Sequence, residues 1–186
     1  SMLRCKFFLF LHKITAEVID TMKEFQRSVW LGWCFTVIAG TLLHFLYAWT
    51  QENRVVGLYS AISESTWEHL KLLFFPSLAY TIWEYLWIGH RYPGYVLRRF
   101  QGTVLGMLTI LALFYTYTGI CGTNFLPADI LVFLLGTTVT ARYTWRNFQR
   151  CTPKRDWIGV LLFAAVAVCF GICSLWPPRF GMFLAP

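Results

Sequence analysis

The sequence predicts an all-α protein, a polytopic bundle of membrane-spanning helices. Of its 186 residues, 57% are hydrophobic and only 13% are charged, whereas a soluble domain carries about 25% charged residues. Apolar runs of about 18 residues, the length that crosses a bilayer as a helix, recur along the chain. Backbone groups must be paired in lipid, and no alternating segments suggest a barrel, so the spans should be helices.

Residues 1–28 differ from the rest of the chain because charged residues interrupt their apolar positions. The run Phe7–Leu11 is too short to cross a bilayer, and no small-residue cleavage site follows it as in a signal peptide. We therefore expect an amphipathic helix that lies at the membrane interface. The transmembrane bundle should occupy residues 29–176, and residues 177–186 should form a short external tail.

About five transmembrane helices are predicted within the bundle. They should cover residues 29–50, 66–89, 102–121, 128–143 and 157–176. The first carries Gly32, Thr36, Gly40 and His44 at four-residue intervals, and small residues at this spacing let helices approach closely in lipid. Because His44 continues the stripe, its ring should face the bundle rather than the lipid.

The distribution of Lys and Arg predicts the orientation of the spans. All but three of the 16 basic residues lie in the amino-terminal segment or in the loops after the second and fourth spans. The exceptions are Arg54, Lys71 and Arg179. By the positive-inside rule the amino terminus is cytoplasmic and the carboxyl terminus is outside. The net charge of +7 thus indicates contact with a lipid bilayer, and no nucleic-acid partner is expected.

Ionisable residues gather in the segment 64–71, Glu-Ser-Thr-Trp-Glu-His-Leu-Lys, at the outer end of the second span. One interpretation is structural, because Ser65 and Glu68 match a capping box at a helix start. The other is a functional site, because carboxylates and imidazoles bind divalent cations such as zinc and carry out acid–base chemistry. The predicted metal ligands are His44, Glu64, Glu68 and His69.

Further residues, most of them in the outer half of the predicted bundle, complete the predicted site. The residues expected to act in catalysis are Glu64, Glu68, His69 and Asp129. Those expected to contact a substrate are Trp67, Lys71, Tyr117 and Glu84. Lys71 would hold an anionic headgroup. Glu84 lies nearer the inner interface, so an ion pair with Arg91, Arg98 or Arg99 is the alternative to a substrate or proton site.

Several segments resemble an uncharacterised family of small bacterial multi-pass membrane proteins with a Glu-Ser-x-Trp-Glu-His-x-Lys motif. They are residues 40–49, Gly-Thr-Leu-Leu-His-Phe-Leu-Tyr-Ala-Trp, residues 64–76, residues 115–120, and Asp129-Ile130. The likeness extends over most of residues 30–145. It implies a multi-pass protein of the bacterial inner membrane, and it implies no particular activity.

Two function classes are favoured, and a non-catalytic assembly or sensor protein is the third that the sequence leaves open. The first is a metal-assisted, hydrolase-like intramembrane enzyme that acts on a lipid or small amphiphile at the outer leaflet, with a metal-activated water as nucleophile. The second is a small-molecule or proton-coupled transporter that uses the outer acids and Glu84 as successive stations. The chain shows no inverted repeat of the kind that many carriers have, which counts against a transporter, but a homodimer could supply the missing walls of a transport path.

The orientation can be tested with a reporter fused after Pro186. Because the basic residues favour the cytoplasmic side, the reporter should be active only outside the cytoplasm. A fusion after Asn147, in the basic loop before the last span, is the control and should report a cytoplasmic position. Cytoplasmic activity of the Pro186 fusion would contradict both the orientation and an outward-facing site.

Overall fold

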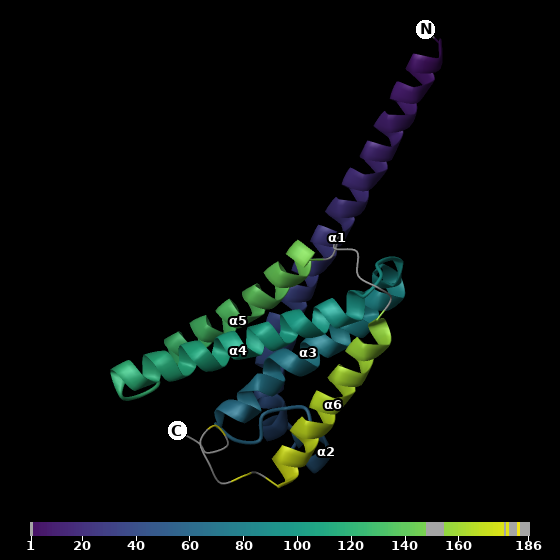
Figure 1. Cartoon of the computed structure of the whole chain (residues 1–186). Coiled ribbons are helices and arrows are strands. Elements are labelled where there is room, and N and C mark those ends of the chain that lie inside the picture. Colours follow the sequence, from purple (N-terminus) through teal and green to yellow (C-terminus); the bar gives the residue numbers. More distant parts are fainter. Residues whose placement is uncertain (1, 148–154, 177, 179–181, 183–186) are drawn as a thin grey trace.

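Every secondary-structure element in the described part of this computed structural model is helical, as predicted. The structure describes residues 2–147, 155–176, 178 and 182, with side chains from residue 19 onward. The elements are α1 (Met2–Trp49), α2 (Arg54–Gly57), α3 (Thr66–Trp87), the 3-10 helix η1 (Gly89–Arg91), α4 (Tyr95–Cys121), α5 (Leu126–Asn147) and α6 (Asp156–Leu175) (Figure 1).

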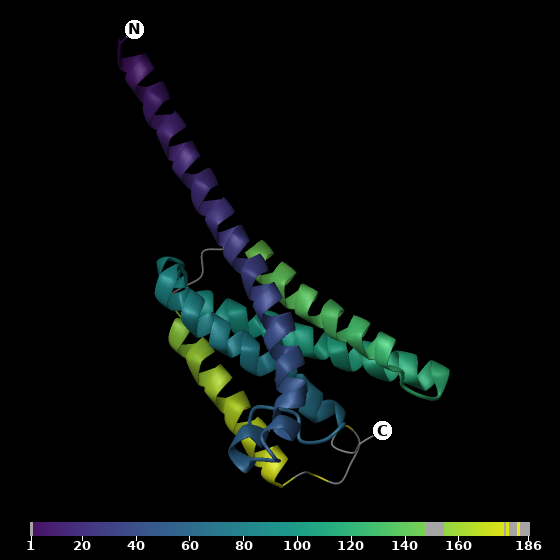
Figure 2. The ribbon, with the colours of Figure 1, turned by 180° about the vertical axis from the view of Figure 1, so that it is seen from behind.

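The helices pack around α3 and α4. Helices α4 and α5 form a long antiparallel hairpin, and α6 packs against α4 (Figure 1). The view from behind shows α1 crossing the bundle, where it contacts α3 and α5 (Figure 2). Helix α3 also contacts α4 and α6, so it meets three of the four other long helices.

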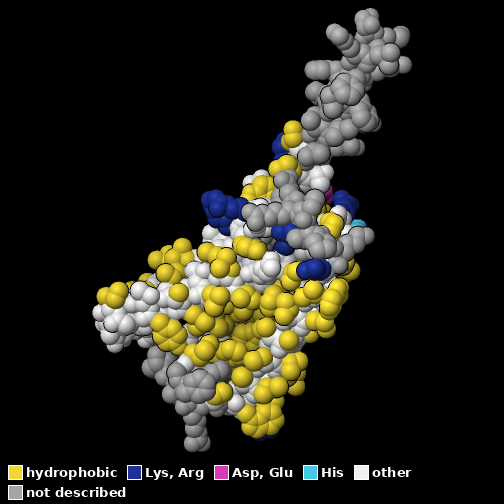
Figure 3. Space-filling model, in the orientation of Figure 1, with side chains coloured by type: hydrophobic (Ala, Val, Ile, Leu, Met, Phe, Trp, Pro, Cys, Tyr) yellow, Lys and Arg dark blue, Asp and Glu magenta, His cyan; other side chains and the backbone are white. Residues whose placement is uncertain are grey.

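Three of the described helical segments are long and apolar enough to cross a membrane. They are Ile19–Trp49, Tyr95–Cys121 and Asp156–Leu175. Hydrophobic side chains cover much of the visible face of the bundle, and Lys and Arg gather at the end where α1 leaves it (Figure 3). These features agree with a membrane protein, but the expected number of about five spans is not confirmed. Helices α3 and α5 are long, but α3 contains Glu68, Lys71 and Glu84.

The amino-terminal segment does not form a helix of its own. A separate interfacial helix was expected over residues 1–28, whereas α1 runs without interruption from Met2 to Trp49. Its amino-terminal half projects from the bundle (Figure 1). The continuity has a simple cause, because neither Gly nor Pro occurs before Gly32 and no other residue type breaks a helix so effectively.

The small-residue stripe of α1 faces the bundle, as predicted, and the helix it meets there is α3. A Cβ atom at Gly40 would lie 2.4 Å from the carbonyl oxygen of Leu72, and one at Gly32 would lie 2.5 Å from the Tyr80 ring. Thr36, between them, is buried. The two backbones can therefore approach closely, which is how helices gain packing energy in lipid.

A carboxylate that the sequence analysis did not single out joins α6 to α4. Asp156 Oδ1 accepts a hydrogen bond from Val96 N at 2.7 Å, and Oδ2 accepts one from Gly94 N at 3.1 Å. These amides belong to the first turn of α4, where backbone donors lack partners within the helix. A carboxylate is also favourable there because of the helix dipole.

Packing at Gly40 can be tested by substitution with alanine. Gly40→Ala places a methyl group against the Leu72 carbonyl and should lower the free energy of unfolding by about 1–3 kcal/mol. The matched control is Gly119→Ala, because a Cβ atom there meets nothing within 4 Å. This control should leave stability unchanged or raise it by up to about 1 kcal/mol. Thermal unfolding in detergent measures both, and equal effects would contradict close packing at Gly40.

Candidate functional site

Two histidines and a glutamate from separate segments converge beside the start of α3. His44 comes from α1, Glu64 precedes α3, and His69 lies in the first turn of α3. One potential ligand atom from each lies within 4.8 Å of those of the other two. The two imidazole centroids are 5.2 Å apart, and Glu64 Oε2 is 3.4 Å from His69 Nε2. The prediction that His44 faces the bundle and reaches this segment is confirmed.

The backbone of α3 fixes the orientation of the His69 ring. Its Nδ1 lies 2.9 Å from the carbonyl oxygen of Ser65, which can only accept, so Nδ1 donates a hydrogen bond to it. Nε2 is therefore the ring nitrogen that faces Glu64 and that an ion could use. Metal-binding histidines are commonly held in this way, with the second ring nitrogen bonded to a carbonyl or carboxylate.

One ring nitrogen of His44 forms no hydrogen bond with the described part of the protein. Its Nδ1 is buried and has no hydrogen-bond partner among the described residues. The ring also makes an edge contact with Phe45, at a centroid distance of 5.0 Å. Buried polar atoms without partners are uncommon in folded proteins and deserve an explanation. A bound ion or ligand would provide one.

The group is open on one side. The Glu64 side chain is 73% exposed and that of His69 is 34% exposed, while His44 is half-buried. A structural zinc site is closed by four protein ligands, whereas this group offers three and leaves one coordination position open. A water molecule or substrate atom could occupy the remaining position.

Glu68 does not belong to the group, although it was predicted as a ligand and precedes His69 in sequence. Its Oε1 accepts a hydrogen bond from Ser174 Oγ at 2.7 Å. Its Oε2 accepts from Ile62 N at 3.0 Å and from Lys71 Nζ at 2.6 Å. Since successive residues on a helix point about 100° apart, the neighbouring side chains face different parts of the molecule.

Only half of the expected capping box forms. Ser65 Oγ accepts a hydrogen bond from Glu68 N at 3.4 Å, so Ser65 is the amino-terminal cap of α3. The carboxylate of Glu68 reaches the amide of Ile62 instead of that of Ser65. Capping therefore accounts for Ser65 but not for the full role of Glu68.

Lys71, which was expected to hold an anionic headgroup, has its contacts inside the protein. The side chain is fully buried. Besides Glu68, its ammonium group donates to the carbonyl oxygens of Gly57 at 2.8 Å and Ser60 at 3.2 Å. An ammonium group has three protons to donate, and these three acceptors match them.

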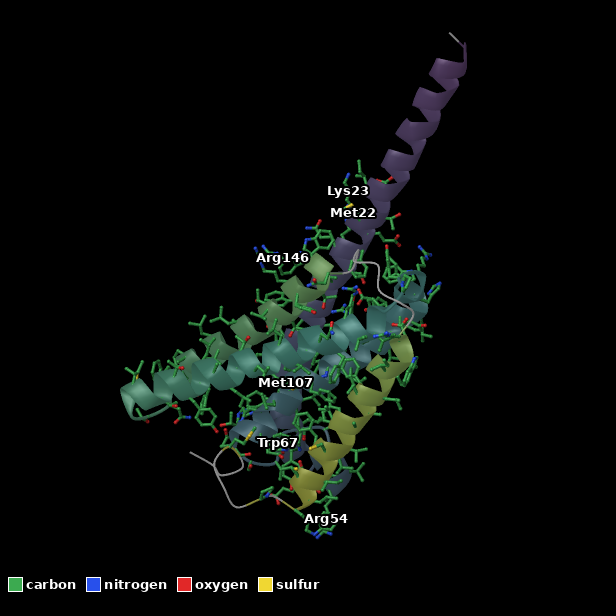
Figure 4. All side chains as sticks on the ribbon, viewed as in Figure 1. Met22, Lys23, Arg54, Trp67, Met107 and Arg146 are labelled. Carbon is green, nitrogen blue, oxygen red and sulfur yellow. The ribbon has the colours of Figure 1, made fainter. Side chains whose placement is uncertain are left out.

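The remaining outer residues of the predicted set lie outside the convergent group. The Trp67 ring packs on Phe170 of α6, with centroids 4.6 Å apart. The Tyr117 hydroxyl donates to Asp129, which joins α4 to α5. Figure 4 shows Trp67 and Arg54 toward the end of the bundle opposite Lys23 and Arg146. No contact in the described structure tests the roles in catalysis or substrate binding predicted for Trp67, Tyr117 and Asp129.

Glu84 belongs to a second polar network. Its ion-pair partner is Arg99, one of the three arginines expected if Glu84 is not a substrate or proton site. The carboxylate is fully buried, forms an ion pair with Arg99 and accepts a hydrogen bond from the Tyr95 hydroxyl. Ser28 Oγ donates to its other oxygen at 2.5 Å. The Arg99 guanidinium also lies over the Tyr80 ring, 5.4 Å from its centroid.

Sequence analysis overlooked the aromatic members of this network. Their spacing was the available signal, since Tyr80 and Glu84 lie four residues apart on α3, as do Tyr95 and Arg99 on α4. Residues at this spacing share a helix face. The network thus joins α1, α3 and α4.

Comparison with known proteins assigns the chain to a family but gives it no activity. No curated protein matches the sequence, and no solved structure matches it. One family model, described as a family of unknown function (DUF6512), matches residues 17–185. This agrees with the uncharacterised family expected from the sequence. Because the match covers most of the chain, the protein belongs to the DUF6512 family.

Proposed function

We propose that this protein is a metal-dependent hydrolase of the cell (inner) membrane, with a divalent ion such as zinc held by His44, Glu64 and His69. One observation carries the proposal, namely the convergence to within 4.8 Å of one side chain from α1 and two from the segment that begins α3. Imidazole nitrogens and carboxylate oxygens are common zinc ligands. In this proposal the site lies on the outer side of a multi-pass protein.

The composition of the group favours catalysis over a structural role. Two histidines and one glutamate form a ligand set used by zinc hydrolases, which keep a further position for water. When bound, such an ion lowers the pKa of its water to about 7 and so supplies hydroxide near neutral pH. The exposure of Glu64 leaves room for that water and for the bond to be cleaved.

The surroundings of His44 favour an amphiphilic substrate. Leu42, Phe45 and Trp49 on the same stretch of α1 are each about half exposed or more. An acyl chain can lie along such a surface while a polar linkage reaches the ion. The proposed reaction is the hydrolysis of an ester or amide bond in a lipid or small amphiphile, with the hydroxyl group of water transferred to the acyl carbon and its proton to the leaving group.

The arrangement of Glu84 argues against the transporter alternative. That alternative needs Glu84 as a second station for a proton or cargo. Both carboxylate oxygens of Glu84 are instead engaged, one by Ser28 and the other by Tyr95 and Arg99. Releasing this carboxylate would leave a charged arginine unpaired in the interior, which is costly.

Metal content tests the first part of the proposal. The protein purified after growth with zinc should contain about one divalent ion per chain by elemental analysis. His44→Ala or His69→Ala removes one ligand and should abolish this content while the protein still folds. The control is His90→Ala, because His90 lies in η1 and bonds through Nδ1 only to the Tyr85 carbonyl. Full metal content in the His44 and His69 variants would refute the site.

Hydrolysis tests the second part. The zinc-loaded protein should cleave some members of a panel of ester- and amide-linked fluorogenic amphiphiles. Chelation should remove this activity and zinc should restore it. Glu64→Gln should lower kcat/KM more than about 100-fold, since loss of even an outer-shell partner costs about 10–100-fold. Glu52→Gln alters an exposed glutamate outside the group and serves as the control. Metal binding without hydrolysis of any member would contradict the enzyme proposal.

A further inference from the structure

A buried ion pair on α3 forms hydrogen bonds with the backbone of the loop that carries Glu64. Lys71 Nζ lies 2.6 Å from Glu68 Oε2. The same ammonium group donates to the carbonyl oxygens of Gly57 and Ser60, and Glu68 Oε2 accepts from the amide of Ile62. Two side chains of α3 thus hold the backbone of residues 57–62 at three points.

The same pair also fixes the loop relative to α6. Glu68 Oε1 accepts a hydrogen bond from Ser174 Oγ at 2.7 Å, across 106 positions of sequence. Lys71 is fully buried and Glu68 is 5% exposed, so water does not compete strongly for these contacts. The loop, α3 and α6 therefore share one charged connection.

Glu64 lies between two anchored residues. Ile62 is held by Glu68. On the other side, Ser65 caps α3, and its carbonyl oxygen lies 2.9 Å from His69 Nδ1. Ser63 and Ser65 are joined by their hydroxyl groups at 3.2 Å. The exposed Glu64 side chain therefore extends toward His69 from a backbone with little freedom.

We propose that Glu68 and Lys71 are positioning residues, which set the loop 57–65 so that Glu64 meets His44 and His69. This inference rests on the proposed metal site. Desolvating two charges is expensive, and a buried ion pair often contributes nothing to stability relative to neutral residues of similar size. Because this pair contacts the loop that carries Glu64, its contribution in this inference is to fix the position of that loop.

The double variant Glu68→Gln/Lys71→Met tests this inference. It removes both charges at once, so no single charge stays buried without a partner. Zinc titration of the full-length protein in detergent should show a dissociation constant raised by about 10–100-fold, the range for outer-shell changes. Because Lys71→Met also removes the donor to the carbonyl oxygens of Gly57 and Ser60, some loss of melting temperature is expected, and zinc affinity measured where the variant is folded is the deciding readout. A merely structural pair would lower the melting temperature and leave zinc affinity unchanged in the folded protein.

The control is Glu24→Gln/Arg91→Met. It removes a surface ion pair, in which Arg91 Nη1 lies 3.9 Å from Glu24 Oε2, and it should not change zinc affinity. Ser174→Ala provides a milder test if the double variant fails to fold. It deletes only the α6 contact of Glu68 and should weaken zinc binding by about 3-fold or more, as expected for the partial loss of an outer-shell contact. Wild-type zinc affinity in Ser174→Ala and in a folded double variant would overturn the inference.

Hydrogen exchange separates this inference from the proposed function. In metal-free protein, amides of residues 57–65 should exchange faster in the double variant than in the wild type. If the wild type binds no zinc, the proposed function fails, and exchange still shows whether the pair orders the loop. If the wild type binds zinc but exchange and affinity are unchanged in the double variant, only the positioning role fails.

Discussion

At Gly40, no side chain separates the backbone of α1 from the Leu72 carbonyl of α3, and even a methyl group would collide there. This close approach determines where the carboxyl-terminal end of α1 lies. His44 follows four residues later on the same face, and its ring comes to 5.2 Å from that of His69. The proposed metal site therefore depends on a packing contact one helical turn away, of the kind that stabilises helices in lipid.

Two buried ion pairs then connect α3 to its neighbours. Glu68 and Lys71 join α3 to the preceding loop and to α6, and Glu84 with Arg99 joins α3 to α4 and α1. Charged groups are costly in lipid and face the protein interior when they occur in spans. Helix α3 carries such charges near both of its ends, and all three of them, Glu68, Lys71 and Glu84, are buried in the bundle.

The segment 64–71 serves two purposes because a helix distributes adjacent residues around its axis. Glu64 and His69 face His44, whereas Glu68 and Lys71 face the loop and α6. One short stretch can thus supply ligands and also the contacts that hold a ligand in place. In the proposed site, metal binding would be coupled to the order of the loop, since the loop would supply one ligand and is held by the same helix.

The sequence by itself determined the helical class, the packing stripe of α1 and the meeting of His44 with Glu64 and His69. The helical class and the stripe follow from hydropathy and helical periodicity, which are local properties of the chain. The meeting of His44 with Glu64 and His69 was predicted from the expected arrangement of the spans, and the packing of α1 against α3 at Gly40 brings it about. Only the tertiary structure decided that Glu68 turns away from His69 and that Lys71 is buried. It also selected Arg99 for Glu84 and placed Ser174, 106 positions distant in sequence, against Glu68. The physical reason is that a charged side chain in an apolar interior takes the partners that packing brings within reach, and sequence spacing does not record them.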